Sequence, residues 1–307
     1  MTLMTETPTG TDDRQTDDRA QNAAAAMAPL ALQTPRTSGW TLEPGARYLV
    51  ALDVDGTLVD HDGRMSRGVK DALRAVVAAG HHVVISTGRS MGATLPVIRQ
   101  GHIDSGFAVC SNGGVTLRLD PELPEHYDVT DRVSFDPAHA LDALSSTLPA
   151  AKFALEGADG RFYSTERFQD ASFGIEAVGV DLHELAEIPA VRLVVYSATD
   201  APEDFADAID QAGLHGVAYS VGWSSWLDVA ANGVSKASAL EQIRRHLGVD
   251  PAHTIAMGDG RNDVEMLQWA ARGVAMGQAP DEVADVADEV TAGVYEDGAA
   301  AILRTLL

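Results

Sequence analysis

The sequence predicts an α/β fold, a doubly wound parallel sheet into which a second, α+β cap domain is inserted. From residue 48 onward, short apolar runs alternate with segments of helical periodicity, the order that gives parallel strands with right-handed crossovers. The alternation loosens between about residues 118 and 230 and then returns. We therefore expect a discontinuous core domain formed by residues 45–117 and 231–307, with a cap domain at 118–230.

The first part of the core domain contributes three predicted strands. The runs YLVALDV, HVVIST and GFAVC are almost wholly apolar, as expected for strands that are covered on both faces. Val69, Leu73 and Val76 have helical spacing, which predicts a helix between the first two strands. The segment ATLPVIRQ predicts a second helix before the third strand, in spite of Pro96.

The inserted segment and the end of the chain also show strands and helices. Strands are predicted at RFYSTERF, VRLVVYSA and WLDVA, and helices at PAHALDALSSTL and APEDFADAIDQAG. GVSKASALEQIRRHLG is then an amphipathic helix, and TIAMGDGRNDVEMLQWA is typical of a strand, a loop and a helix. RGVAMG and DEVT supply the last short strands.

The N-terminal residues 1–44 differ from the rest of the chain. TETPTGTDDRQTDDR is polar and acidic, and the Ala-rich stretch after it is broken by Pro29 and Pro35. Such a composition buries too little apolar surface to offset the entropy lost on ordering. We predict a disordered tail here.

Composition excludes several functions. The formal charge of −23 argues against a nucleic-acid partner. The absence of an apolar run of 18 residues and of a secretory signal predicts a cytoplasmic protein that does not bind membranes. Cys110 is the one cysteine, which excludes an intramolecular disulfide, and we predict that it is buried. The sequence does not predict an oligomeric state.

Polar residues end all three of the first predicted strands. Asp53 and Asp55 end the first, Thr87 ends the second, and Ser111 and Asn112 follow the third. Ligands of open α/β sheets bind beyond these carboxyl ends. Residues two apart on an extended chain point the same way, so the two carboxylates should converge. The alternative is a simple Asx turn at the end of the strand.

A second acidic cluster lies in GDGRND. Asp259 follows the strand TIAM, and Asp263 begins a helix, where it could also serve as a cap. If this strand neighbours the first one, the carboxylates of both loops meet. Mg²⁺ prefers oxygen ligands, so a magnesium ion is the natural counter-charge.

Four motifs in order resemble those of one enzyme superfamily. DVDGTL, STGR, GVSK and GDGRND resemble the four motifs of the haloacid dehalogenase (HAD) superfamily of phosphatases. The insertion between the second and third motifs, preceded by SNGG, resembles the Cof-type subfamily of sugar-phosphate and cofactor phosphatases. The resemblance covers residues 48–307. It implies a phosphoric monoester hydrolase that acts on a small phosphorylated metabolite.

The resemblance also implies roles for the acidic residues. Asp53 would be the nucleophile that forms an aspartyl-phosphate, and Asp55 the general acid and base. Mg²⁺ would be held by Asp53, the backbone carbonyl of Asp55 and Asp259. Asp263 would complete the metal site by orienting a water or Lys236.

Further residues are candidates for binding the substrate. Thr87 and Lys236 resemble the phosphate-binding residues of the second and third motifs, although Thr87 could be a helix cap and Lys236 a surface lysine. The other candidates around the phosphate are Gly88, Arg89, Asn112 and Asn262, of which Arg89 and Asn112 could instead stabilise turns. Candidate contacts to the leaving group in the cap are Glu156, Arg161, Arg167, Trp223 and Trp226. Gln278 stands where the family often has Asn.

The sequence therefore favours a Mg²⁺-dependent phosphatase of small phosphomonoesters. Two alternatives stay open. One is a phosphomutase or other phosphotransferase of the same superfamily, and the other is a non-catalytic protein that binds a phosphorylated ligand. The Asp53 and Asp55 pair argues against the second alternative, because binding alone needs no acid–base residue. The sequence does not identify the metabolite.

Overall fold

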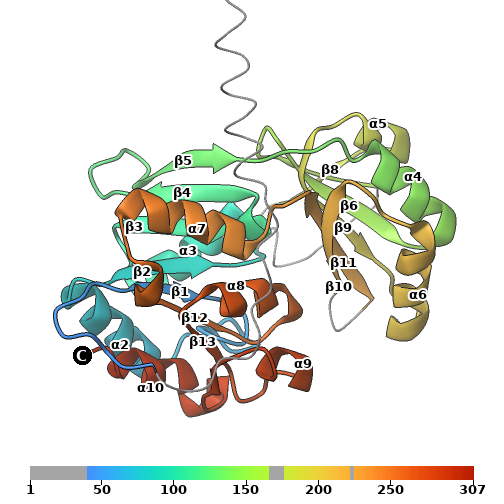
Figure 1. The fold of residues 1–307 in the computed structure, drawn as a ribbon. Coiled ribbons are helices and arrows are strands. Elements are labelled where there is room, and N and C mark those ends of the chain that lie inside the picture. The colour runs from blue at the N-terminus through green and yellow to red at the C-terminus, as the bar shows by residue number, and fades with distance from the viewer. Residues whose placement is uncertain (1–39, 166–175, 222–224) are drawn as a thin grey trace, which may run out of the picture. The chain divides into compact units, whose positions relative to one another are not determined.

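The described residues form two β-sheets. The computed structural model describes residues 40–165, 176–221 and 225–307. The first sheet has the strand order β14-β13-β12-β1-β2-β3-β4-β5, and the second has the order β10-β11-β9-β6-β7-β8 (Figure 1). The strands are β1 Leu49–Leu52, β2 His82–Ser86, β3 Gly106–Cys110, β4 Val115–Leu119, β5 Tyr127–Arg132, β6 Lys152–Gly157, β7 Phe162–Ser164, β8 Val178–Gly179, β9 Ala190–Tyr196, β10 Val217–Val221, β11 Trp226–Ala231, β12 Thr254–Gly258, β13 Arg272–Ala275 and β14 Glu289–Val290.

The α-helices are α2 Arg67–Ala78, α3 Met91–Gly101, α4 Ala138–Thr147, α5 Leu182–Ala186, α6 Pro202–Ala212, α7 Lys236–Leu247, α8 Val264–Trp269, α9 Asp281–Ala284 and α10 Gly298–Arg304. The described helices include the six that the sequence predicts, α2, α3, α4, α6, α7 and α8, together with α5, α9 and α10, which it does not predict. Short 3₁₀ turns are η1 Ser111–Gly113, η2 Pro251–His253, η3 Arg261–Asp263 and η4 Val294–Glu296. The predicted α/β fold with an inserted second sheet is confirmed.

The first sheet is mixed rather than wholly parallel. Strands β14 to β3 pair in parallel, whereas β3, β4 and β5 pair antiparallel. The reason is the short connection through η1, because a tight turn can join only antiparallel neighbours. The expected start of the cap domain at residue 118 falls inside β4. The chain passes to the second sheet only after Arg132, and it leaves that sheet at Ala231.

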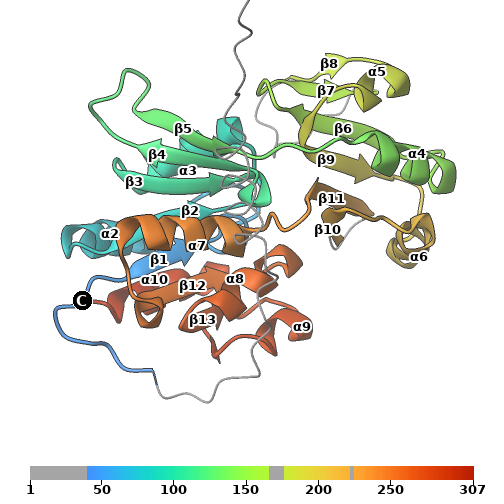
Figure 2. The same cartoon turned by 45° about the horizontal axis from the view of Figure 1, so that its top comes forward.

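Helices cover both faces of the first sheet. Along β1, Val50 and Leu52 pack toward α2, α3 and α10, whereas Leu49 and Ala51 pack toward α7, α8 and α9. Figures 1 and 2 show these two layers of helices. Because both faces are covered, β1 reads as an unbroken apolar run, as predicted.

The second sheet has helices on one face. Leu193 and Val195 of β9 point to the face covered by α4, α5 and α6. The opposite face carries Ala154 and Val194 together with charged residues. This opposite face lines part of a cavity with Arg192 and Asp228.

Three further expectations concern the N-terminal residues, Cys110 and membrane-spanning helices. Most of the predicted tail, residues 1–39, lies outside the described residues, and the described chain begins at Trp40, whose ring packs against Tyr48. Cys110 is fully buried, as predicted, and burial raises the pKa of its thiol to about 12. Among the helices that the structure describes, none has the length and apolar character needed to cross a bilayer.

Candidate active site

Neighbouring strands bring the sequence-predicted residues to one edge of the first sheet. Strand β1 lies between β12 and β2, and all three are parallel. Asp259 follows β12, Asp53 follows β1 and Thr87 follows β2. The backbone N–H of Asp53 donates to the carbonyl of Met257 at 3.0 Å, which fixes the ends of β1 and β12 beside each other.

Three carboxylates form a cluster at this edge. Asp53, Asp259 and Asp263 each offer an oxygen, and these oxygens lie within 4.8 Å of one another. Asp53 and Asp263 are buried and Asp259 is half-buried. Three hard oxygen donors in a buried site are the ligand set that suits a small divalent cation such as Mg²⁺. The residues therefore fit the expected metal.

Lys236 provides a fixed positive charge next to this cluster. Its Nζ donates to Asp53 Oδ1 and to Asp263 Oδ1, both at 2.6 Å, and its side chain is fully buried. The position follows from the local sequence. Ser235 caps α7 by accepting from the backbone N–H of Ser238, so Lys236 is the first residue of the helix and stands at the edge of the sheet.

The loop after β12 is built around Asp263. Asp263 Oδ2 accepts from the backbone N–H groups of Asp259 and Gly260, at 3.0 and 2.9 Å. Gly56 is required opposite this loop. Its φ is +75°, and a Cβ there would lie 2.0 Å from Asp259 Oδ2. The glycine of the first motif thus allows the two acidic loops to approach each other.

The electrostatics of the cluster reflect crowding of negative charge. Burial, followed by repulsion from Asp263, raises the pKa of Asp53 well above its ordinary value, against the opposing charge of Lys236. Burial likewise raises the pKa of Asp259 to about 6. Burial alone would lower the pKa of Lys236, but the charges of Asp263 and Asp53 outweigh it and raise that pKa. A positive charge that neutralises these carboxylates is therefore favourable at this site.

Asp55 lies apart from the three-carboxylate cluster. Its side chain is 61% exposed and accepts two bonds from Arg89, from Nε at 2.9 Å and from a terminal nitrogen at 2.5 Å. The chain turns at Gly56, and Asp55 forms an isolated bridge with Val59. Asp53 is thus buried and Asp55 exposed, although the charge of Asp55 still contributes to raising the pKa of Asp53. Arg89 holds Asp55 at the mouth of the site.

Gln278, which stands where the family often has Asn, contacts both acidic loops. Its Nε2 donates to the carbonyl of Gly56 at 2.6 Å and to Asp259 Oδ2 at 2.9 Å. Its Oε1 accepts from the backbone N–H of Val294 at 3.0 Å. Gln278, which follows β13, therefore joins the segments after β1, β12 and β14.

The remaining core candidates also meet at this edge. Thr87 is buried, and its Oγ1 accepts from the backbone N–H of Arg89 at 3.1 Å. Asn262 Nδ2 donates to Asn112 Oδ1 at 3.0 Å, and both side chains lie next to Gly88, where a Cβ would approach them to within 3.1–3.4 Å. Asn112 itself has a left-handed φ of 52°.

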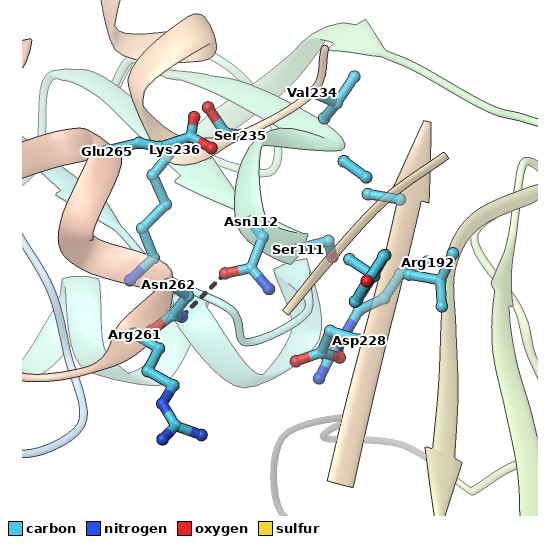
Figure 3. Close-up of a pocket in the computed structure, with 14 residues that line it drawn as sticks. Ser111, Asn112, Arg192, Asp228, Val234, Ser235, Lys236, Arg261, Asn262 and Glu265 are labelled. Atoms are coloured by element: carbon cyan, nitrogen blue, oxygen red, sulfur yellow. Dashed lines mark hydrogen bonds and ion pairs between the residues drawn. The ribbon is translucent and has the colours of Figure 1, made fainter. Parts of the chain in front are cut away.

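A cavity of about 370 Å³ opens next to these residues. The loop ends of the first sheet line one part of it with Asn112, Lys236 and Asn262, and the second sheet lines another part with Arg192 and Asp228 (Figure 3). Sequence reasoning missed this last pair. The signal was present, because each is a lone charge inside a strand run that is otherwise almost wholly apolar, VRLVV and WLDVA.

The cap candidates named from the sequence have other positions. Glu156 is buried and accepts from Ser111 Oγ at 2.5 Å. Arg161 is ion-paired with Asp159, and Trp226 packs against Tyr196. None of these cap residues lines the described cavity. The candidates Arg167 and Trp223 lie outside the described residues.

Comparison with known proteins identifies the family of this chain. Residues 50–303 match the family model of haloacid dehalogenase-like hydrolases. The chain is 29% identical to 5-amino-6-(5-phospho-D-ribitylamino)uracil phosphatase YitU of Bacillus subtilis, over 84% of this chain and 96% of the relative. It is also 29% identical to a phosphoglycolate phosphatase of Methanoculleus marisnigri, over 80% and 91% of the two chains.

Solved structures show the same fold. The HAD phosphatase BT1666 of Bacteroides thetaiotaomicron is 27% identical, with a TM-score of 0.69, over 88% of this chain and 99% of that one. The HAD subclass IIB sugar phosphatase BT4131 has a TM-score of 0.71 at 23% identity, over 84% and 98%. The family match spans both acidic loops, Lys236 and the inserted sheet. This chain therefore belongs to the haloacid dehalogenase-like hydrolase family and is a phosphatase of that family.

Proposed function

We propose that this phosphatase hydrolyses small phosphomonoesters, such as sugar phosphates or related metabolites, with Mg²⁺ and through an aspartyl-phosphate on Asp53. One observation carries the proposal above all. The carboxylate of Asp53 lies beside a buried lysine and two further carboxylates, at the edge of the sheet where ligands of this fold bind. A binding protein has no need for such a group, whereas covalent phosphoryl transfer does.

The first step transfers the phosphoryl group to the enzyme. A carboxylate oxygen of Asp53 attacks phosphorus in line, and the bond from phosphorus to the ester oxygen breaks. For this step Asp55 leaves its ion pair with Arg89 and takes up a proton from solvent, and it then gives that proton to the departing oxygen, which leaves as an alcohol. Arg89 holds Asp55 through two hydrogen bonds, which keeps this acid at the mouth of the site.

The second step returns the enzyme to its starting state. Asp55, now a carboxylate, removes a proton from a water molecule, and the resulting hydroxide attacks the phosphorus of the aspartyl-phosphate. The bond to Asp53 breaks and inorganic phosphate leaves. Throughout, Lys236 offsets negative charge next to Asp53, and we infer that the hydroxyl of Thr87, which is buried at the end of β2, binds a phosphate oxygen.

The metal would be held by Asp53 and Asp259, with Asp263 joining directly or through water, and by the backbone carbonyl of Asp55. When bound, Mg²⁺ supplies a positive charge that polarises the phosphoryl group and reduces repulsion between it and the carboxylates. Its affinity depends on how firmly the ligands are held.

Metal removal should abolish turnover. With EDTA, phosphate release from p-nitrophenyl phosphate and from a panel of sugar and polyol phosphates should fall to background, and added Mg²⁺ should restore it. Acid quench with a radiolabelled substrate, followed by peptide mapping, should place the label on Asp53. Turnover that persists without divalent metal, or label on another residue, would refute the proposal. Isomerised sugar phosphate in place of free phosphate would identify a mutase.

Gln278→Leu should raise the Mg²⁺ concentration needed for half-maximal activity by about 10-fold to 100-fold. The leucine removes the donor that holds Asp259 Oδ2 and the carbonyl of Gly56, so the ligands lose their fixed position. Metal titrations of phosphate release and calorimetry with Mg²⁺ both measure the shift. Gln242→Leu, on the exposed face of α7, is the matched control. Unchanged metal affinity in Gln278→Leu would show that this contact does not support the site.

A further inference from the structure

We propose that Arg192 and Asp228 are the specificity-determining pair of this enzyme, and that they select a neutral, hydroxyl-bearing leaving group over one with a second anionic group. The proposal deepens the function proposed above and rests on it. It assigns a role to two charged residues that lie outside the predicted phosphoryl-transfer machinery.

Strand pairing places the two residues on the same face of the second sheet. Val194 of β9 lies opposite Asp228 of β11, and Arg192 is two residues from Val194 on the same side. That face is the one opposite α4, α5 and α6. The adjacent residues Leu193 and Val229 point the other way and pack into the helix-covered core. Arg192 and Asp228 therefore both line the cavity (Figure 3).

The cavity connects this pair with the site of phosphoryl transfer. Its other part is lined by Asn112, Lys236 and Asn262, and Lys236 reaches Asp53 at 2.6 Å. An ester whose phosphorus lies at Asp53 would extend its leaving group into the cavity. With about 370 Å³, the cavity has room for a group of a few carbon and oxygen atoms up to a hexose.

On the side of the second sheet, Arg192 and Asp228 form an ion pair with each other. Arg192 Nε donates to Asp228 Oδ1 at 2.6 Å, and both side chains are largely buried. A carboxylate or second phosphate on the leaving group would lie close to Asp228 and would compete with it for Arg192. Both effects oppose binding of an anionic leaving group. Asp228 repels it, and separating the buried Arg192–Asp228 ion pair costs free energy.

The other charges nearby do not reverse this balance. Glu156 lies directly opposite Arg192 on β6 and adds a second acidic group to the same face. Arg261 also lines the cavity, but it is ion-paired with Glu282, and Glu265 stands on the same wall. Arg192 and Arg261 are each ion-paired with a carboxylate, so an anionic leaving group would have to compete with Asp228 and Glu282 for them.

A hydroxylated leaving group satisfies the same pair without separating it. A hydroxyl can donate to a carboxylate oxygen and accept from a guanidinium N–H, and two adjacent hydroxyls can do both at once. Glu156 keeps this face in place over the site, because it accepts from Ser111 Oγ at the end of β3. This hydrogen bond connects the face that carries Arg192 and Asp228 to the loop after β3.

The test compares two esters of nearly the same size. Glycerol 3-phosphate has a neutral diol leaving group, and 3-phosphoglycerate carries a carboxylate on the same carbon skeleton. We expect kcat/KM for the first to exceed that for the second by at least about 100-fold. Asp228→Asn should reduce this ratio at least tenfold, with little change for p-nitrophenyl phosphate, whose leaving group lacks both features. Asp207→Asn, an exposed carboxylate on α6, is the matched control.

A second variant and a binding measurement separate the possible failures. Arg192→Gln/Asp228→Asn removes both charges of the pair together and should also reduce the ratio, even if the single variant folds poorly. Calorimetry of both esters with the Asp53→Asn enzyme should reproduce the preference without turnover. Absence of phosphate release with the preference intact would overturn the proposed function alone. Equal affinity for the two esters, or a ratio that both variants leave unchanged, would overturn this inference.

Discussion

Asp53→Asn should lower kcat by at least about 10⁴-fold for every phosphomonoester that the enzyme accepts. An amide is too weak a nucleophile to attack phosphorus and is a poorer metal ligand than a carboxylate. The chain should remain folded, because an amide oxygen can still accept from Lys236. Steady-state kinetics and thermal unfolding of the same preparation measure both quantities.

The same variant should not lose stability. Burial and the charge of Asp263 already raise the pKa of Asp53, so loss of its negative charge relieves repulsion. We expect a melting temperature equal to or higher than that of the wild type. Asp71→Asn, an exposed carboxylate on α2, controls for general effects of the substitution. If Asp53→Asn kept half of the wild-type rate, the assignment of the nucleophile would be wrong.

Lys236→Met should reduce both stability and activity. The methionine removes a buried cation that bonds two buried carboxylates at 2.6 Å. Leaving Asp53 and Asp263 without their partner should cost about 3–5 kcal/mol in the free energy of unfolding. The rate should fall by at least about 100-fold, because a fixed positive charge beside the transferring group is lost.

Urea unfolding without metal measures the loss of stability in Lys236→Met. Added Mg²⁺ should restore part of it, since a ligand that binds only the folded chain raises its apparent stability. Lys70→Met, at a partly exposed position on α2, should change stability by less than about 1 kcal/mol. A Lys236→Met enzyme that unfolds at the wild-type urea concentration would show that the lysine does not balance these carboxylates.

The carboxylate cluster could be predicted from sequence because its determinants are local. Asp53 and Asp259 each end a buried apolar run, and parallel strands that neighbour each other place such residues at one edge. Lys236 lies in the segment GVSKASALEQIRRHLG, whose amphipathic repeat predicts a helix. The position of each residue at the end of a strand or the start of a helix needed only nearby residues, whereas the pairing of β1 with β12, which brings the two loops together, comes from the structure.

The features that the sequence did not predict depend on distant partners or on loop geometry. The antiparallel pairing of β4 and β5 with β3 extends the first sheet past residue 118, and strand pairing is not encoded in one strand alone. The outward position of Asp55 follows from the turn at Gly56 and from Arg89, which is 34 residues away. The pairing of Arg192 with Asp228 joins two strands 36 residues apart.

The chain passes from the first sheet to the second after Arg132 and returns at Ala231, shortly before the helix that begins with Lys236. The proposed catalytic groups all lie on one side of these two crossings, and the Arg192–Asp228 pair lies on the other. New substrate preferences can therefore arise by mutation within one continuous stretch of the gene while the reaction chemistry is inherited unchanged. The substrate-recognising insert can thus diversify among related enzymes independently of the residues that transfer the phosphoryl group.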